Sequence, residues 1–397
     1  MKKMKKMKKL IFLITLIVVS NYSNSQGWVK QNSGITNALF SLSFTNNQQG
    51  WAVGSGGKII TTNNGGTNWT EQSSNETMGL NDVYFINNSI GWSCGRNGVI
   101  KTTDGGKTWS RIYTTVLGNE INTIHFMDEN IGWVAGKALG SKIFLLKTID
   151  GGVNWTDYSN RLDYPYGASG NVLDIFFLND NLGWFVGQDA TEDACWKTID
   201  GGESWTRMHF GITCPKFGID FTDESHGWVA GKFKYSTSNS GADWDNLFPT
   251  LTQYAYDVDF IDNNTGWIIG DSGQVSMTNN SGFSWTMEPT PVVSNLYSIQ
   301  MIDKNTGWIV GSNGVILTYN SNLNATNKLK EEFLRISPNP STSIISINLN
   351  YNTLRITDFE GRLIKTIYNQ NIIDISEFST GIYFFDIDGK NIKVVKE

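Results

Sequence analysis

The sequence is poor in charged residues and in groups suited to metal or covalent chemistry. Only 17% of its 397 residues are Asp, Glu, Lys or Arg, and it has three cysteines and three histidines. His125, His209 and His226 lack the spacing of metal ligands, so we expect no metal site and no cofactor. No P-loop, dinucleotide-binding fingerprint, GxSxG or CxxC motif is present, which argues against the enzyme classes that use them.

Long apolar runs are also lacking. The apolar segment at residues 10–19 is too short to span a bilayer, which needs about 20 residues. It follows a lysine-rich start and precedes the small residues Ser23 and Ser25. Residues 1–25 are therefore predicted to be a secretory signal peptide. We expect a mature chain with no transmembrane segment, secreted or held at the outer-membrane surface.

Basic charge is scarce once this peptide is removed. The peptide carries six of the 31 basic residues, so 25 (31 minus 6) remain against 37 acidic residues, a formal balance of −12. Because binding to phosphate groups needs clustered Lys and Arg, this balance excludes nucleic acid and anionic membranes as expected partners.

Glycine and tryptophan are abundant, with 41 and 15 residues, and the tryptophans recur at regular intervals. One series follows glycine, with separations of 41, 41, 51, 44, 39 and 41 residues: Trp51, Trp92, Trp133, Trp184, Trp228, Trp267 and Trp308. A second series ends a turn-like phrase: Trp28, Trp69, Trp109, Trp155, Trp205, Trp244 and Trp285. A period near 41 with short strands indicates one β-propeller blade per repeat.

The repeat count predicts an all-β fold with seven blades. Each unit supplies strands A to D, but the seventh, at residues 298–322, has no final strand. The segment GWVKQ at residues 27–31 resembles that missing strand, so we expect the last blade to be completed by both ends of the propeller. Such closure removes exposed sheet edges.

The phrase TDGGKTW at residues 103–109 is predicted to form the hairpin between strands C and D. Aspartate accepts hydrogen bonds from its own turn, glycine tolerates positive φ, and tryptophan buries a large ring. Asn replaces Asp in other copies. We therefore assign structural rather than catalytic roles to Asp104, Gly106, Trp109, Asp150, Gly152, Trp155, Asp200, Gly202 and Trp205.

The pattern Thr102-x-Asp104-x-Gly106-x-Thr108-Trp109 resembles the Asp-box, or bacterial neuraminidase repeat. Sialidases, sortilin-type receptors, xyloglucan hydrolases and photosystem II assembly-factor-like propellers share this motif. The combination with Gly-Trp in a single seven-bladed ring is most similar to the last family. The resemblance covers residues 26–322 and implies a fold, whereas one fold hosts many functions.

The repeat pattern stops after residue 322. Residues 323–332 form a polar linker, and residues 333–397 contain alternating strands of a small β-sandwich. The PNP start, the Gly361-Arg362 turn and the GIYFFDI strand closely resemble the C-terminal sorting domain of type IX secretion, type A. The resemblance implies export through that machinery. An ordinary β-sandwich binding module is the alternative.

Insertions in the third and fourth repeats predict a binding surface. The extra residues lie at 137–142, 157–171 and 188–194, in B–C loops and one D–A connection, which open on the same face of a propeller. Their aromatic and acidic side chains could bind a protein or glycan. The candidate ligand-binding residues are Tyr158, Asp163, Tyr164, Tyr166, Asp189, Glu192, Asp193 and Trp196. Loop drift without a ligand is the alternative.

Two further hypotheses concern this face. Cys195 and Cys214 should lie on it in neighbouring blades, so we predict a disulfide between them, with two thiols as the alternative. Asp189, Glu192 and Asp193 show no calcium-loop spacing and are interpreted as solvated acids.

The leading functional interpretation is a monomeric, non-enzymatic binding propeller outside the cell. A carbohydrate-active hydrolase that uses a carboxylate pair in the inserted loops is the second. A factor that assists assembly of a surface or membrane complex is the third. A sialidase fits poorly, because the propeller has only four arginines: Arg96, Arg111, Arg161 and Arg207.

Overall fold

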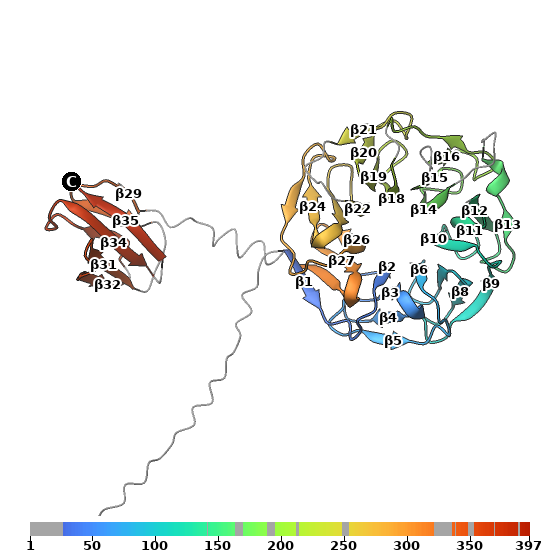
Figure 1. Ribbon diagram of the computed structural model, residues 1–397, viewed down its shortest axis with the longest axis horizontal. Helices are drawn as coiled ribbons and strands as arrows, with labels where there is room; N and C mark the ends of the chain where they lie inside the picture. The colour runs from blue at the N-terminus through green and yellow to red at the C-terminus, as the bar shows by residue number, and fades with distance from the viewer. Residues whose placement is uncertain are drawn as a thin grey trace, which may run out of the picture.

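The computed structural model describes residues 27–140, 142–162, 170–188, 195–211, 214–247, 254–320, 336–337, 339–347, 353–368, 370–387 and 390–397. Between Gly27 and Asn320 these residues form seven four-stranded antiparallel sheets that surround a central opening (Figure 1). The predicted all-β propeller is confirmed. None of the described segments forms a helix with the length and hydropathy that crossing a bilayer would need.

Six blades are built from consecutive strands. The first three contain β2 (Leu39–Phe44), β3 (Gly50–Gly54), β4 (Ile59–Thr62) and β5 (Thr70–Gln72); β6 (Leu80–Phe85), β7 (Gly91–Gly95), β8 (Gly98–Thr102) and β9 (Ser110–Thr114); and β10 (Glu120–Phe126), β11 (Gly132–Ala138), β12 (Lys142–Thr148) and β13 (Thr156–Asp157). The next three contain β14 (Asn171–Phe177), β15 (Gly183–Gln188), β16 (Trp196–Thr198) and β17 (Thr206–Arg207); β18 (Lys216–Phe221), β19 (Gly227–Gly231), β20 (Lys234–Thr237) and β21 (Asp245–Leu247); and β22 (Ala255–Phe260), β23 (Gly266–Gly270), β24 (Val275–Thr278) and β25 (Thr286–Glu288). Short 3₁₀ turns are η1 (Ser55–Gly57), η2 (Ser159–Arg161), η3 (Asp271–Gly273) and η4 (Ser312–Gly314).

The seventh blade joins the two ends of the propeller. It consists of β26 (Leu296–Asp303), β27 (Thr306–Gly311), β28 (Ile316–Asn320) and, as the outermost strand, β1 (Gly27–Gln31). Trp28 lies opposite Tyr319 in the antiparallel ladder. The Trp28 indole also donates a hydrogen bond of 2.8 Å to Glu288 Oε2, at the end of β25 in the sixth blade. The first strand is thus bound both to the last strand of the ring and to the preceding blade.

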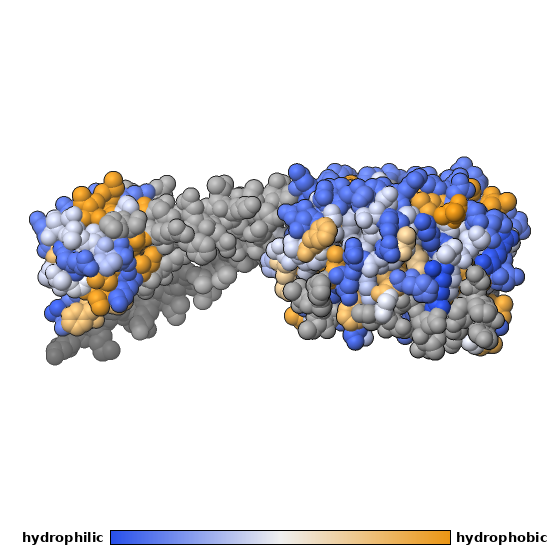
Figure 2. Space-filling model, turned by 90° about the horizontal axis from the view of Figure 1, so that it is seen from above, coloured by the Kyte–Doolittle hydropathy of each residue, from blue (hydrophilic) through white to orange (hydrophobic). Residues whose placement is uncertain are grey.

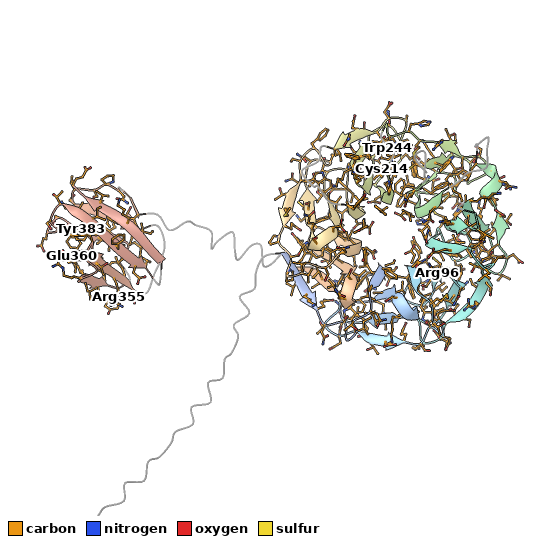
Figure 3. The ribbon with its side chains drawn as sticks, in the orientation of Figure 1. Arg96, Cys214, Trp244, Arg355, Glu360 and Tyr383 are labelled. Carbon is orange, nitrogen blue, oxygen red and sulfur yellow. The ribbon has the colours of Figure 1, made fainter. Side chains whose placement is uncertain are left out.

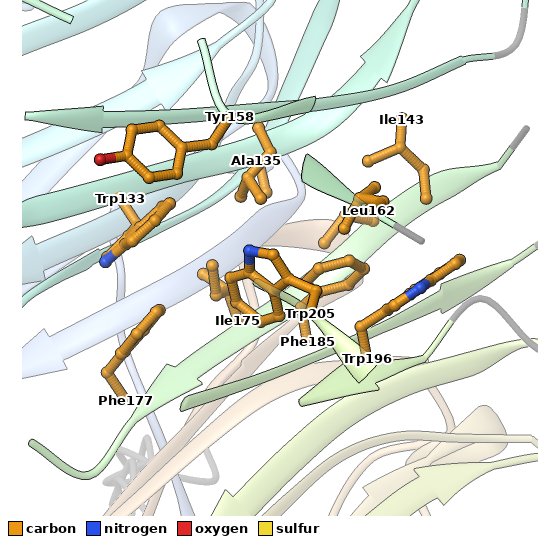
Figure 4. Close-up of a cluster of buried hydrophobic side chains, with 12 residues drawn as sticks. Trp133, Ala135, Ile143, Tyr158, Leu162, Ile175, Phe177, Phe185, Trp196 and Trp205 are labelled. Atoms are coloured by element: carbon orange, nitrogen blue, oxygen red, sulfur yellow. The ribbon is translucent and has the colours of Figure 1, made fainter. Parts of the chain in front are cut away.

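Aromatic stacks hold neighbouring blades together. Trp92 of β7 lies parallel to Phe126 of β10, with ring centroids 3.6 Å apart, and Trp155 meets the same phenyl ring edge-on at 6.3 Å. The same three-ring arrangement joins the third and fourth blades through Trp133, Phe177 and Trp205 (Figure 4). All seven tryptophans of the Gly-Trp series are fully buried, as are Trp28, Trp196 and Trp205. Those of the turn series range from buried, as Trp109 and Trp205, to half-buried, as Trp155.

Five tryptophans of the Gly-Trp series (Trp51, Trp92, Trp184, Trp228 and Trp308) also tie a blade to the turn of the next blade. The Trp92 indole N–H donates to the carbonyl of Gly151, at 3.1 Å. Lys101, the residue that begins the phrase KTTDGG, donates from Nζ to the same carbonyl at 3.0 Å. Trp51 bonds in the same way to Gly105. Gly105 adopts a φ of +75°, which glycine tolerates without strain and which lets the turn present its carbonyl to the indole.

A cavity of about 290 Å³ lies in the central channel and is lined by the innermost strands. Aspartates on these strands bond to the backbone of the next blade: Asp82 Oδ2 accepts from Ile124 N–H at 2.8 Å, and Asp174 Oδ2 from Ile219 N–H at 2.9 Å. Gln300 closes the circle by accepting from Phe44 N–H at 2.7 Å. These side chains satisfy backbone N–H groups on the unpaired edges of β10, β18 and β2.

Enclosure in the ring makes these carboxyl groups sensitive to pH. Desolvation raises the pKa of Asp174 to about 7, from an ordinary value of 3.8, and also raises the pKa values of Asp82 and Asp257. Between about pH 8 and pH 6.5 the folded state gains protons that the unfolded chain does not bind, so stability increases as pH falls. Below pH 6.5 His125, whose pKa burial lowers to about 4, acts in the opposite direction.

We therefore expect the thermal unfolding midpoint to be higher at about pH 6.5 than at pH 8. The carboxyl groups keep some contact with the channel, so we expect a modest increase of about 2–4 °C, which corresponds to about 1 kcal/mol in a domain of this size. Differential scanning calorimetry of the wild type and of Asp174→Asn, which cannot titrate there, measures this. Equal midpoints at both pH values in the wild type would contradict the expectation.

The described C-terminal residues form two further sheets. One contains β29 (Ile336–Ser337), β30 (Ile344–Ile347) and β33 (Ile372–Asp374); the other contains β31 (Leu354–Asp358), β32 (Leu363–Ile367), β34 (Gly381–Ile387) and β35 (Lys390–Lys396). A single apolar cluster that includes Ile345, Ile356 and Phe385 fills the space between them. The domain boundaries stay a prediction, and the predicted signal peptide and linker lie outside the described residues.

Candidate functional site

The Asp-box carboxylates are engaged by their own turns. Asp104 Oδ1 accepts from the Thr108 backbone N–H at 2.9 Å and from the Thr102 hydroxyl at 2.8 Å. These bonds, the Thr108 N–H foremost, lower the pKa of Asp104 to about 2. Gly106, with φ of +86°, donates its N–H to Thr102 Oγ1. In the same way, Asp150 accepts a hydrogen bond from the Asn154 backbone N–H, and Asp200 accepts one from the Ser204 backbone N–H. This geometry is that of a turn rather than of an acid–base catalyst.

Two of the predicted ligand-binding residues lie in the core. Trp196 is 1% exposed and stacks on Phe185 at 5.0 Å, and Tyr158 is 8% exposed and meets Trp133 edge-on at 5.1 Å. Their rings fill the space between the third and fourth blades (Figure 4), so they offer no open platform to a ligand. The other six candidates, Asp163, Tyr164, Tyr166, Asp189, Glu192 and Asp193, lie outside the described residues.

The insertion of the third blade lengthens a hairpin instead of forming a loop over the face. Lys137 pairs with Ile143 and Ala138 with Lys142, which extends β11 and β12 beyond the length of other blades. The insertion after β13 forms η2, where Arg161 lies over the Tyr158 ring at 3.8 Å. The described residues of these two insertions thus add to the scaffold.

The predicted disulfide is not formed in the structure. Both cysteines are present as thiols. Cys195 is fully buried in the cluster between the fourth and fifth blades, which includes Trp184 and Tyr235. Cys214 Sγ lies 3.8 Å from Lys216 Nζ on the following strand. The prediction placed both residues on one face, whereas the Cys195 side chain faces the core.

A groove does open on the face that carries the B–C and D–A connections. It consists of two adjoining hollows of about 770 and 340 Å³ that share Met78, Arg96 and Glu120. The inner hollow is lined by Phe40 and η1, and the outer by the connection from β9 to β10. Figure 3 places Arg96 close to the central opening. We call this surface the blade 1–2 groove.

Arg96 is the accessible cation of this groove. It follows β7, and its side chain is 63% exposed. Its Nε donates to Glu120 Oε1 at 3.1 Å, which orients the guanidinium, and no other described residue accepts a hydrogen bond from its two Nη groups. A guanidinium with its terminal nitrogens available can bind a carboxylate in a bidentate manner.

A second arginine supports the wall. Arg111 Nη2 contacts Glu76 Oε1 and Oε2 at 2.5 and 2.6 Å, and the Glu76 side chain is only 5% exposed. Asn97 Nδ2 donates to the same carboxylate at 3.0 Å. Arg111 is therefore committed to this network, which fixes the B–C turn that carries Arg96.

Apolar side chains stand beside these polar groups. Met78 is 47% exposed, Val116 is 69% and Leu117 is 94%. Exposed apolar groups that gather beside an available cation mark a surface for binding rather than for solvation alone. At its inner end the groove reaches Phe40, whose ring centroid lies 6.0 Å from that of Tyr297 on the innermost strand β26.

The inferences from sequence missed this groove, although they identified the face. Its residues come from connections of ordinary length in three repeats, so no spacing anomaly marks them. In the sequence, Arg96 and Arg111 serve only in the count of four arginines that argues against a sialidase. An exposed Leu117 beside Val116 in a connection is the one local signal that could have indicated it.

Two family models match the chain, one within the propeller and one in the C-terminal segment. The family described as photosynthesis system II assembly factor YCF48 matches residues 20–116 and 231–320. The family described as secretion system C-terminal sorting domain matches residues 335–397. No curated protein matches the chain.

Solved structures share the fold at low sequence identity. YCF48 bound to D1 peptide is 22% identical with a TM-score of 0.61, and the match covers 74% of this chain and 96% of that one. PorZ of Porphyromonas gingivalis, a surface component of the type IX secretion system, is 14% identical with a TM-score of 0.57, and the match covers 91% of this chain and 59% of that one. A xyloglucanase from Xanthomonas campestris is 10% identical with a TM-score of 0.58, and the match covers 74% and 53%. The chain thus combines a YCF48-like Asp-box propeller with a type IX C-terminal sorting domain.

Proposed function

We propose that the protein is an exported, non-enzymatic binding module whose blade 1–2 groove takes an extended protein segment. The segment would place a carboxylate against Arg96 and apolar side chains against Met78 and Leu117. The observation that carries this proposal is the Arg96 guanidinium, held by Glu120 with its Nη groups directed to no described acceptor. The match to a secretion sorting domain supports export outside the cell.

The matched structures agree with this proposal in kind. YCF48 has been solved with a peptide bound, and PorZ is a surface component of a secretion system. The first supports a propeller that binds a protein segment, and the second supports a propeller at the cell surface. At 22% and 14% identity they supply the fold, and the partner of this chain is argued from its own groove.

The test is binding of the mature chain to a displayed library of short peptides. We expect selected peptides to combine an acidic group with apolar residues. Arg96→Ala should weaken the best peptide at least tenfold, because a charge-assisted bidentate contact contributes about 1.5–3 kcal/mol. Lys107→Ala, in an exposed Asp-box turn, is the matched control and should bind as the wild type does. Peptide affinity that is equal in the Arg96 and Lys107 variants would reject the groove.

Two other functions remain as outcomes of related assays. Release of sugars from a polysaccharide, lost in variants of Asp189, Glu192 or Asp193, would establish the hydrolase, which the xyloglucanase match favours only at the level of fold. Loss of a multiprotein surface complex on deletion of the gene, with no free peptide ligand, would favour an assembly factor. Glycan binding without peptide binding would mean that the protein is a binding module whose ligand is a glycan rather than a protein segment.

A further inference from the structure

One strand of the larger sheet of the C-terminal domain, β34, carries apolar side chains on both faces. On β34 the side chains of Tyr383, Phe385 and Ile387 are buried against the smaller sheet. The alternate residues Ile382 and Phe384 point to the opposite face and are 38% and 39% exposed. An antiparallel sheet with one solvated face usually places polar residues there. This strand therefore departs from the expected alternation.

The strand register extends the patch across neighbouring strands. Phe384 lies opposite Thr357 of β31 and Lys393 of β35, and Ile382 lies opposite Val395. Thr357 in turn lies opposite Leu363 of β32, which is 53% exposed. We call the surface made by Leu363, Ile382, Phe384 and Val395 the outer face. Figure 2 shows apolar residues in orange on the surface of this domain.

Basic residues border the outer face. Arg355 and Lys393 are exposed and share this side of the sheet by register. Arg355 of β31 lies opposite Asp386 of β34. Lys393 of β35 lies opposite Phe384, so the register places no acidic residue opposite this lysine. Figure 3 labels Arg355 on β31 and Tyr383 on the adjacent strand β34, whose side chain belongs to the opposite face of the sheet. The patch is thus an apolar centre with positive charge at its edge.

We propose that the outer face is the surface through which the sorting domain docks on a protein of the secretion machinery. The partner surface would have an apolar centre and an acidic residue facing Lys393. Exposed apolar patches with polar rims mark protein interfaces, and opposite charges fix their orientation. The inference rests on the proposed export through the sorting domain, because that role requires recognition of these residues by another protein.

The test is export of the full chain from a cell that carries the secretion system. Ile382→Thr combined with Phe384→Thr removes the apolar centre but keeps residues that favour strands. We expect at least a tenfold loss of extracellular protein with accumulation in the periplasm, while the purified variant keeps the wild-type unfolding midpoint. Lys393→Glu should reduce export independently. Ile372→Thr, on the smaller sheet and 70% exposed, is the matched control and should be exported normally.

The outcomes separate this inference from the proposed route. If a chain that lacks residues 333–397 is still exported, the route itself is wrong. If that deletion blocks export but the double variant and Lys393→Glu are exported like the wild type, only the outer face is rejected. If light scattering gives a wild-type dimer that the double variant converts to monomer, the occupant is a second copy of this chain and the proposal is overturned.

Discussion

Replacement of Trp92 with alanine is expected to lower the free energy of unfolding of the propeller by about 3–5 kcal/mol. The ring is fully buried, stacks on Phe126 at 3.6 Å and lies under Lys101 Nζ at 4.9 Å. Its N–H also satisfies the Gly151 carbonyl of the next blade. The alanine variant therefore leaves a cavity and removes one contact between blades. Chemical denaturation followed by circular dichroism measures the loss.

Two further variants divide this effect into its parts. Trp92→Phe keeps an aromatic ring but loses the indole N–H, and should cost less than the alanine variant. Phe283→Ala removes an aromatic ring that is 83% exposed, and should change stability by no more than about 0.5 kcal/mol. If Trp92→Ala unfolds at the same denaturant concentration as Phe283→Ala, the stack does not hold the blades together.

Removal of residues 27–31 is expected to make the protein, which we expect to be monomeric, associate into oligomers. Without β1, the backbone of β28 loses its partner along the register from Ile316 to Asn320, and Tyr319 loses the Trp28 ring at 5.0 Å. An unpaired, apolar edge strand pairs readily with other chains. Light scattering at micromolar concentration should detect oligomers, together with a lower unfolding midpoint.

The control for this deletion keeps the strand. Lys30→Ala changes an exposed side chain of β1 without removing backbone hydrogen bonds, and should remain monomeric. A truncated protein that stays monomeric with the wild-type midpoint would mean that the ring does not depend on this strand.

The architecture was predictable because it repeats. Seven Gly-Trp pairs and a turn phrase with fixed spacing define one blade each, and in the second blade the Gly-Trp pair begins β7, directly before β8. The strand β35 is harder to recognise from the sequence, because lysines interrupt its alternation of apolar and polar residues.

The candidate site was not predictable in the same way. Spacing identifies where residues are inserted but not which way their side chains point. Trp196 turns into the core, whereas Met78, Arg96 and Leu117 converge from connections of ordinary length. Their proximity depends on the packing of neighbouring blades, which a period alone does not specify. The Asp-box carboxylates were easier to interpret because their partners lie within four residues.

The closure of the seventh blade sets an order of events during synthesis. A chain that emerges from its N-terminus makes β1 first and β28 last, so the outermost strand must wait for almost 300 residues before its partner exists. Six blades can pair internally in the meantime. The sorting domain follows directly in the sequence, so it becomes available only after the last strand of the ring has emerged. Any apparatus that engages this domain thereby meets a propeller that already has every strand it needs to close.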